Sequence, residues 1–210
     1  MLHEILTKLA QHAVLTFSSL GIACLIGLPL GMYLTRIKSK KVAHAVIRIS
    51  GLIQTVPGLA MLALIVVALV SLRAFVDLPT TGRLPATCAL CLYALFPILT
   101  NTYTGIKQVS PAMVEVAKGM GMTRSQILFW VEVPNAVPFI MTGIQISAIW
   151  TIGMATLTSL IGSGGLGDLI MQGLRSMQLD LVLAGTIPAG IFALTCEWGI
   201  NRLKLWLMPR

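Results

Sequence analysis

Long apolar segments separated by short polar ones dominate the pattern of residues along this chain. A helix needs about 20 mostly apolar residues to cross roughly 30 Å of hydrocarbon, and segments of that kind recur from end to end. We therefore predict an all-α integral membrane protein that forms a single domain over residues 1–210. About five spans are expected, at residues 13–35, 49–72, 84–106, 135–161 and 180–201.

Charged residues are scarce. Hydrophobic residues make up 56% of the chain and charged residues 10%, whereas a soluble domain carries roughly 25% charged residues. So few charges cannot cover a water-exposed surface, and we expect lipid to surround most of the chain. The net charge is +8, but the charges lie between apolar segments and form no basic stripe with aromatic residues, which argues against nucleic acid as a partner.

Lysine and arginine are divided unequally between the two ends of the predicted bundle. One end takes eleven of the fifteen, within residues 36–48, 107–134 and 202–210. The other end takes the remaining four, which are Lys8, Arg73, Arg83 and Arg175. Because short loops rich in Lys and Arg stay in the cytoplasm, the pattern predicts an N-terminus outside and a cytoplasmic C-terminus. An odd number of spans satisfies this orientation.

The second expected span contains the least helical sequence of the five. Pro57 removes a backbone donor and crowds the preceding turn, and Gly58 follows it. We predict a kink or break between Gln54 and Gly58. Backbone groups freed inside lipid must be satisfied by protein or by cavity water, so Gln54, Thr55 and Pro57 are candidates for lining a solute pathway. A kinked helix with a packing role alone remains the alternative.

The longest stretch between spans is expected to form two short helices joined by a tight turn. The first is predicted over residues 111–120, and Gly121 suits the turn because glycine tolerates the positive φ that ends many helices. Thr123 with Gln126 three residues later forms a capping box for the second helix, which is expected to end before Pro134. The product is a helix–turn–helix elbow over residues 110–134.

This elbow resembles the permease signature of ABC importers. The family pattern is Glu-Ala-Ala, three residues, Gly, nine residues, an aliphatic, one residue, an aliphatic and Pro, and the chain departs from it mainly in having Val116 in place of Ala. The resemblance implies that the elbow docks on a separate cytoplasmic ATPase and couples its movement to the spans. The residues it places in this elbow are Glu115, Ala117, Gly121, Val131 and Pro134.

Two further segments resemble permeases for glycine betaine, choline and carnitine. They are residues 51–60, which contain Gln-Thr-Val-Pro, and residues 161–168, a turn expected on the outer side. The glycines of that turn are Gly162, Gly164, Gly165 and Gly167. Methionine permeases share a similar turn, so a methionine-type importer is the alternative. Because aromatic rings attract quaternary ammonium groups, the mid-span aromatics Tyr93, Phe96 and Trp150 join the candidate pathway residues.

The resemblance implies a type I importer permease arrangement in a bacterial cytoplasmic (inner) membrane. Its implied partners are a cytoplasmic ATPase, a second permease subunit of the same or a related chain, and an external solute-binding protein. The sequence lacks a G-x-x-x-x-G-K-[ST] loop, so we expect ATP and Mg²⁺ to bind the ATPase, with no cofactor or metal in this chain. The sequence also contains no pair or triad of residues typical of a catalytic site, so we expect a transport subunit rather than an enzyme.

A secondary carrier is a more distant alternative, because the first four spans carry no charge at their centres. Glu197, near the end of the fifth span, is expected to snorkel or to pair with Arg202. The three histidines, His3, His12 and His44, are interpreted as polar residues at the membrane interface.

Overall fold

The computed structural model describes residues 1–208; Pro209 and Arg210, the last of the basic residues counted above, lie outside the described part. Residues 1–208 form helices and no strand. The elements are α1 (Leu2–Leu34), α2 (Lys40–Thr55), α3 (Gly58–Leu72), α4 (Arg83–Lys107), α5 (Pro111–Gly119), α6 (Arg124–Gln126), the π-helix η1 (Ile127–Glu132), α7 (Val133–Ala155), the 3₁₀-helix η2 (Leu157–Ile161), α8 (Leu166–Ser176) and α9 (Leu179–Leu207).

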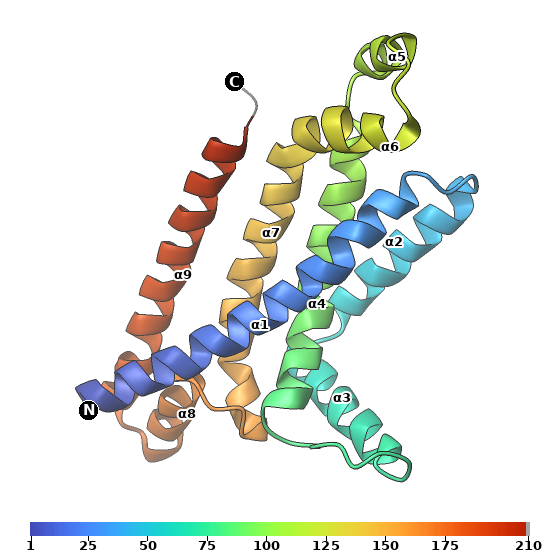
Figure 1. Cartoon of the computed structure of the whole chain (residues 1–210). Helices are drawn as coiled ribbons and strands as arrows, with labels where there is room; N and C mark the ends of the chain where they lie inside the picture. The colour runs from blue at the N-terminus through green and yellow to red at the C-terminus, as the bar shows by residue number, and fades with distance from the viewer. Residues whose placement is uncertain (209–210) are drawn as a thin grey trace.

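Four helical segments are long and apolar enough to cross a membrane: α1, α4, the continuous stretch Arg124–Ala155, and α9. The pair α2–α3 makes a fifth crossing if its two helices, bent by 106°, count as one broken span. Figure 1 shows the elbow of α5 and α6, the α1–α2 connection and the described C-terminal end at one end of the molecule. The basic segments of the sequence therefore gather at one end, which we call the basic end.

The second expected span, residues 49–72, is broken where the sequence predicted. Helix α2 ends at Thr55, Val56 is extended with φ −70° and ψ 125°, and α3 begins at Gly58. The reason is steric, because Pro57 disfavours the helical region for the residue before it. The helical part also begins earlier than expected, at Lys40 rather than residue 49.

The second elbow helix does not end before Pro134, as the sequence suggested. The helix runs on through η1 into α7, so that elbow and fourth span are continuous. A π-helical turn shifts the backbone bonds to i→i+5 partners, and Pro134, which has no N–H to donate, follows this turn directly at the start of α7. The outer part of the expected span 135–161 is not α-helix, because α7 ends at Ala155 and η2 follows.

Helix α8 was not predicted. It has 11 residues, too few to span the membrane. Its buried Leu166 and Leu169 form a cluster with Ala189 of α9, and a side chain at Gly185 would meet Ile170 at 2.6 Å. Leu166, Leu169 and Gly173 follow helical spacing, which is the signal that could have revealed this helix. The first and fifth spans also exceed their expected bounds, since α1 begins at Leu2 and α9 ends at Leu207.

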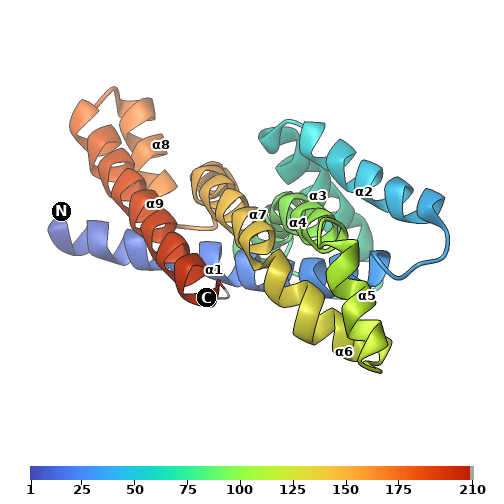
Figure 2. The same cartoon turned by 90° about the horizontal axis from the view of Figure 1, so that it is seen from above.

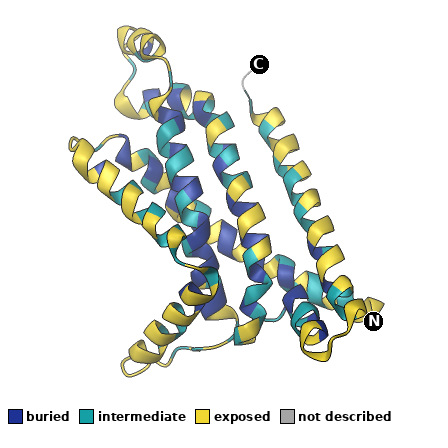
Figure 3. Ribbon diagram, turned by 180° about the vertical axis from the view of Figure 1, so that it is seen from behind, coloured by how far each residue is buried: buried dark blue, intermediate teal, exposed yellow. Residues whose placement is uncertain are grey.

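The core lies between α1, α4 and α7. Small residues let these helices approach closely, as is usual where lipid removes the hydrophobic driving force. A side chain at Gly31 of α1 would meet Thr102 of α4 at 2.8 Å, and one at Gly143 of α7 would meet the carbonyl oxygen of Pro97 at 2.7 Å. Figure 2 shows α8–α9 and α2–α3 on opposite sides of this core, and Figure 3 shows that α3, α9 and much of α2 are exposed.

Candidate functional site

The elbow is a locally encoded structure. Helix α5 ends in a Schellman motif, in which the Gly121 N–H donates to the Lys118 carbonyl at 2.9 Å and the Met122 N–H donates to the Ala117 carbonyl at 3.1 Å. Gly121 has φ +78°, which confirms the predicted positive φ. The predicted capping box is also confirmed, because the side chains of Thr123 and Gln126 each accept from the other's backbone N–H.

The signature residues lie on different faces of this elbow. Ala117 is buried and Val131 half-buried, and both line a concave apolar surface of about 380 Å³. Glu115 and Gly121 are exposed, and Pro134 is half-buried at the start of α7. The apolar surface is lined by Ala112, Met113, Val116, Ala117, Met120, Met122 and Val131, and we call it the elbow groove.

An ion pair connects the elbow to the end of α1. The Arg36 guanidinium donates through both terminal nitrogens to the two carboxylate oxygens of Glu132, whose side chain is 8% exposed. A buried carboxylate is costly unless it is paired, and this bidentate geometry satisfies it. Burial, and then the charge of Arg124, lowers the pKa of the Arg36 guanidinium. Lys107 Nζ adds a bond to the Thr35 carbonyl at 3.1 Å.

Sequence reasoning missed this pair. Its only signal was a charge at Glu132 between the two apolar residues of the signature. Two polar concavities adjoin it, of about 220 and 280 Å³. Arg36 and Lys118 line both of them, Arg124 lines only the larger one, and Glu115 lines only the smaller one.

The broken span is held by two reciprocal bonds to α4. Pro97 has no N–H, so the Tyr93 carbonyl lacks its normal partner within the helix; Gln54 Nε2 donates to that carbonyl at 2.9 Å. The break leaves the Val56 carbonyl free, and the Tyr93 hydroxyl donates to it. Each helix interruption is thus satisfied by a side chain of the other.

Other predicted pathway residues are partly brought to this place. Phe96 lies against Gly51, where an added side chain would meet its ring at 3.1 Å. Thr55 is exposed at the end of α2, and Pro57 is exposed between the two helices. Trp150 lies on α7 and is 58% exposed. It shares no hydrogen bond or ring contact with the other five among the described residues.

The glycine-rich turn joins η2 to α8 with positive φ at Gly162 (+78°), Gly164 (+80°) and Gly165 (+96°). Residues that carry a side chain rarely adopt a positive φ, which explains why three of the residues in this turn are glycines. The Gly165 N–H donates to Gln11 Oε1 of α1 at 3.1 Å. Gly167 lies in α8, directly against the Thr156 carbonyl oxygen, so that no side chain fits there.

His12 is fully buried and links α1 to α7, so its interpretation as a residue at the membrane interface was wrong. Its exposure is 0%, and its Nε2 lies 3.1 Å from the Ile152 carbonyl oxygen. In an α-helix that carbonyl would bond to Thr156, but the Thr156 N–H donates to Gly153 instead. Next to it, Lys8 and Asp168 form an ion pair at 2.5 Å. Helix α1 therefore contacts both α7 and α8 around the turn.

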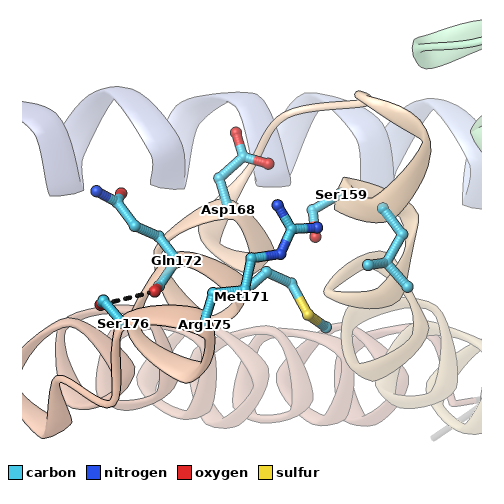
Figure 4. Close-up of a pocket in the computed structure, with 7 residues that line it drawn as sticks. Ser159, Asp168, Met171, Gln172, Arg175 and Ser176 are labelled. Atoms are coloured by element: carbon cyan, nitrogen blue, oxygen red, sulfur yellow. Dashed lines mark hydrogen bonds between the residues drawn. The ribbon is translucent and has the colours of Figure 1, made fainter.

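A pocket of about 430 Å³ opens between η2 and α8 beside that ion pair. Figure 4 shows Asp168 and Arg175 on α8 with Ser159 contributed by the neighbouring element. The pocket carries one acidic and one basic side chain, and Ser176 Oγ donates to the Gln172 carbonyl at 2.9 Å. Among residues 1–208 no group of acidic, histidine or cysteine side chains could hold a metal ion.

Glu197 has a different partner from the one expected. It accepts a bond from Gln145 Nε2 of α7 at 3.2 Å, while Arg202 lies over the ring of Trp198 at 5.4 Å. Lys204 Nζ donates to Thr142 Oγ1 at 3.0 Å. These two polar contacts join α9 to α7 towards the basic end.

Residues 27–210 match the model of a protein family described as the binding-protein-dependent transport system inner membrane component. The chain belongs to this family. It is a multi-pass permease subunit of a binding-protein-dependent transport system, which confirms the resemblance that the elbow carried.

Three curated relatives cover nearly the whole chain. It is 42% identical to the carnitine transport permease protein OpuCB of Listeria monocytogenes, over 99% of this chain and 90% of that protein. It is 41% identical to the glycine betaine/carnitine/choline transport system permease protein OpuCB of Bacillus subtilis, with coverage of 99% and 90%. The choline transport system permease protein OpuBB of the same organism is 41% identical, over 98% and 89%.

Solved structures show the same fold. An inward-facing structure of the MetNI methionine ABC transporter superposes with a TM-score of 0.86 at 21% identity, covering 100% of this chain and 98% of that one. The crystal structure of an amino acid ABC transporter gives a TM-score of 0.71 at 20% identity, with coverage of 96% and 91%. The chain therefore has the type I importer permease fold, as predicted.

Proposed function

We propose that this permease imports a small osmoprotectant, namely glycine betaine, carnitine or choline. The support comes from relatives at 41–42% identity that are named for these solutes. The likeness to the methionine transporter, at 21% identity, concerns the fold alone. An external binding protein delivers the solute, and the spans of two permease subunits pass it inward. The second subunit is a copy of this chain or a related one.

The single observation that carries the coupling mechanism is the exposed elbow groove. Met113, Val116 and Met120 are 46%, 64% and 76% exposed on the elbow, outside the bundle. Exposed apolar surface of this kind marks a contact with another protein, and methionine side chains adapt to a partner's shape. We assign the groove, together with the exposed Glu115 and Gly121 elsewhere on the elbow, to the contact with a cytoplasmic ATPase that binds ATP and Mg²⁺.

The elbow continues as one helix into α7, so a displacement of the elbow acts directly on that span. Val131 and Pro134 lie on this continuous segment, and the Arg36–Glu132 pair transmits the same displacement to α1. Alternating access then needs ATP and loaded binding protein to favour different states energetically. In this scheme the basic end is cytoplasmic, the N-terminus is outside, and α8 with the glycine-rich turn faces the binding protein.

Reconstitution tests this function. The permease, its ATPase and its binding protein are placed in proteoliposomes and offered labelled glycine betaine, carnitine, choline and methionine at equal concentration. We expect ATP-dependent accumulation of at least one osmoprotectant and none of methionine. Accumulation of methionine alone would contradict the solute assignment and leave the family assignment intact.

A further inference from the structure

Helix α2 has three distinct faces. One face packs against α1 and α4, where Ala43 forms a buried cluster with Leu34 and Leu99. A second face is exposed and apolar, and we call it the apolar flank; its residues are Val42 and Ile49. The third is exposed and polar, and we call it the polar stripe; its residues are Lys41, His44, Arg48 and Thr55. Their spacing of three, four and seven residues keeps the stripe on one side of the helix.

The stripe extends deep into the membrane-crossing part of the molecule. Arg48 lies between Ala43, which packs beside Leu99, and Gly51, which lies against Phe96. Leu99 and Phe96 are about 12–16 Å along α4 from its last residue, Lys107, at 1.5 Å of rise per residue. The hydrocarbon of one leaflet is about 15 Å thick. A guanidinium at this level that faced lipid would be costly, so such groups face water or protein.

Among residues 1–208 no acidic side chain forms an ion pair with Arg48, and the apolar flank beside it is the surface suited to lipid. The stripe begins at the basic end and finishes at Thr55, next to Gln54 and the break at Val56. It therefore connects that end to the place where two interrupted helices exchange bonds, and where Phe96 offers an aromatic ring.

We propose that the polar stripe of α2 lines the inner half of the solute pathway, and that Arg48 makes this half selective for solutes without a net positive charge. This rests on the proposed osmoprotectant function. Glycine betaine and carnitine pair their ammonium with a carboxylate, whereas choline is a cation. A fixed guanidinium repels choline along the pathway and leaves a zwitterion nearly unaffected. In water, two unit charges about 7 Å apart interact strongly enough to change a rate about threefold.

Cysteine labelling tests the pathway assignment whatever the solute is. In the nucleotide-free complex, built on a permease without its four native cysteines, a small impermeant thiol reagent is added from the basic end. Arg48→Cys and Thr55→Cys are expected to react, because a thiolate needs water around it. The matched controls Val42→Cys and Ile49→Cys, on the apolar flank, are expected not to react. Equal labelling of both faces, or labelling of neither, overturns the proposal.

Uptake by charge variants tests the selectivity. With one binding protein throughout, Arg48→Gln is expected to raise the choline-to-betaine uptake ratio about threefold, and Arg48→Glu further. Arg48→Lys keeps the charge, and its choline-to-betaine uptake ratio is expected to stay below that of Arg48→Gln. A ratio that does not change in Arg48→Glu overturns the role of Arg48. If the wild-type complex takes up none of these solutes, the proposed function fails, and the labelling pattern still decides whether the stripe faces water.

Discussion

The pair between Arg36 and Glu132 offers the sharpest test of how the elbow is attached to the bundle. Glu132 is 8% exposed and Arg36 is 38% exposed, so the two partners are not equivalent. Breaking a fully buried pair costs about 3–5 kcal/mol, because it leaves an uncompensated buried charge. Arg36→Gln leaves the buried carboxylate, whereas Glu132→Gln leaves a guanidinium that can turn to water.

Two features of the site set the expected magnitudes. Lys118 and Arg124 line the concavity beside Glu132, and their charges partly replace the missing guanidinium. Arg36→Gln is therefore expected to cost about 2 kcal/mol, below the full buried-pair value. Glu132→Gln keeps one acceptor for Arg36 and is expected to cost about 1 kcal/mol. The double variant leaves no unpaired charge and is expected to be more stable than Arg36→Gln alone.

The assay is thermal unfolding of the purified permease in detergent, with ATP-driven uptake by the complex measured in parallel. We expect uptake to fall in the order of the stability losses, because the same contact positions the elbow. The reasoning would be refuted if Glu132→Gln proved the more damaging single change, or if the two single losses simply added in the double variant.

Three further predictions concern the turn, the orientation and the broken span. Gly121→Val places a branched side chain at φ +78°, and it is expected to cost about 1–3 kcal/mol at the elbow. Uptake should fall while the protein still inserts into the membrane. In the control Gly119→Ala the added carbon meets nothing within 4 Å, so uptake should be retained, and equal uptake in both variants would contradict the role of the turn. In a permease without its native cysteines, a cysteine at the exposed Ser39 is expected to resist an impermeant thiol reagent in intact cells while one at the exposed Thr81 reacts, and the reverse pattern would invert the proposed orientation. Tyr93→Phe removes the donor to the Val56 carbonyl and is expected to lower stability by about 1–3 kcal/mol, measured by thermal unfolding; an unchanged midpoint would show that water replaces the hydroxyl.

The sequence by itself determined the features that depend on neighbours in the chain. The lengths of the apolar segments predicted the all-helical membrane class, because a helix in lipid satisfies its own backbone within one segment. The break before Pro57, the positive φ at Gly121 and the Thr123–Gln126 capping box were also predictable. Each depends on steric limits or hydrogen bonds that reach only a few residues along the chain.

Tertiary structure alone decided which distant groups meet. The Arg36–Glu132 pair joins residues 96 apart in sequence, and His12 reaches the Ile152 carbonyl across 140 residues. A freed carbonyl or a buried charge needs a hydrogen-bonding partner, but the sequence contains several donors that could supply it. Likewise, Tyr93 was picked out for its ring, while its hydroxyl and its carbonyl both serve the broken span.

The continuity of the elbow with α7 and the existence of α8 were also settled by packing. Pro134 is a helix breaker in an isolated α-helix, and here the helix passes through it directly after the π-helical turn η1, where the regular i→i+4 bonds are already interrupted. Helix α8 is too short to be stable alone, and its apolar face is covered by α9. The faces of α2 were not foreseen, because helix was expected only from residue 49, and the position of α4 decides which face is covered.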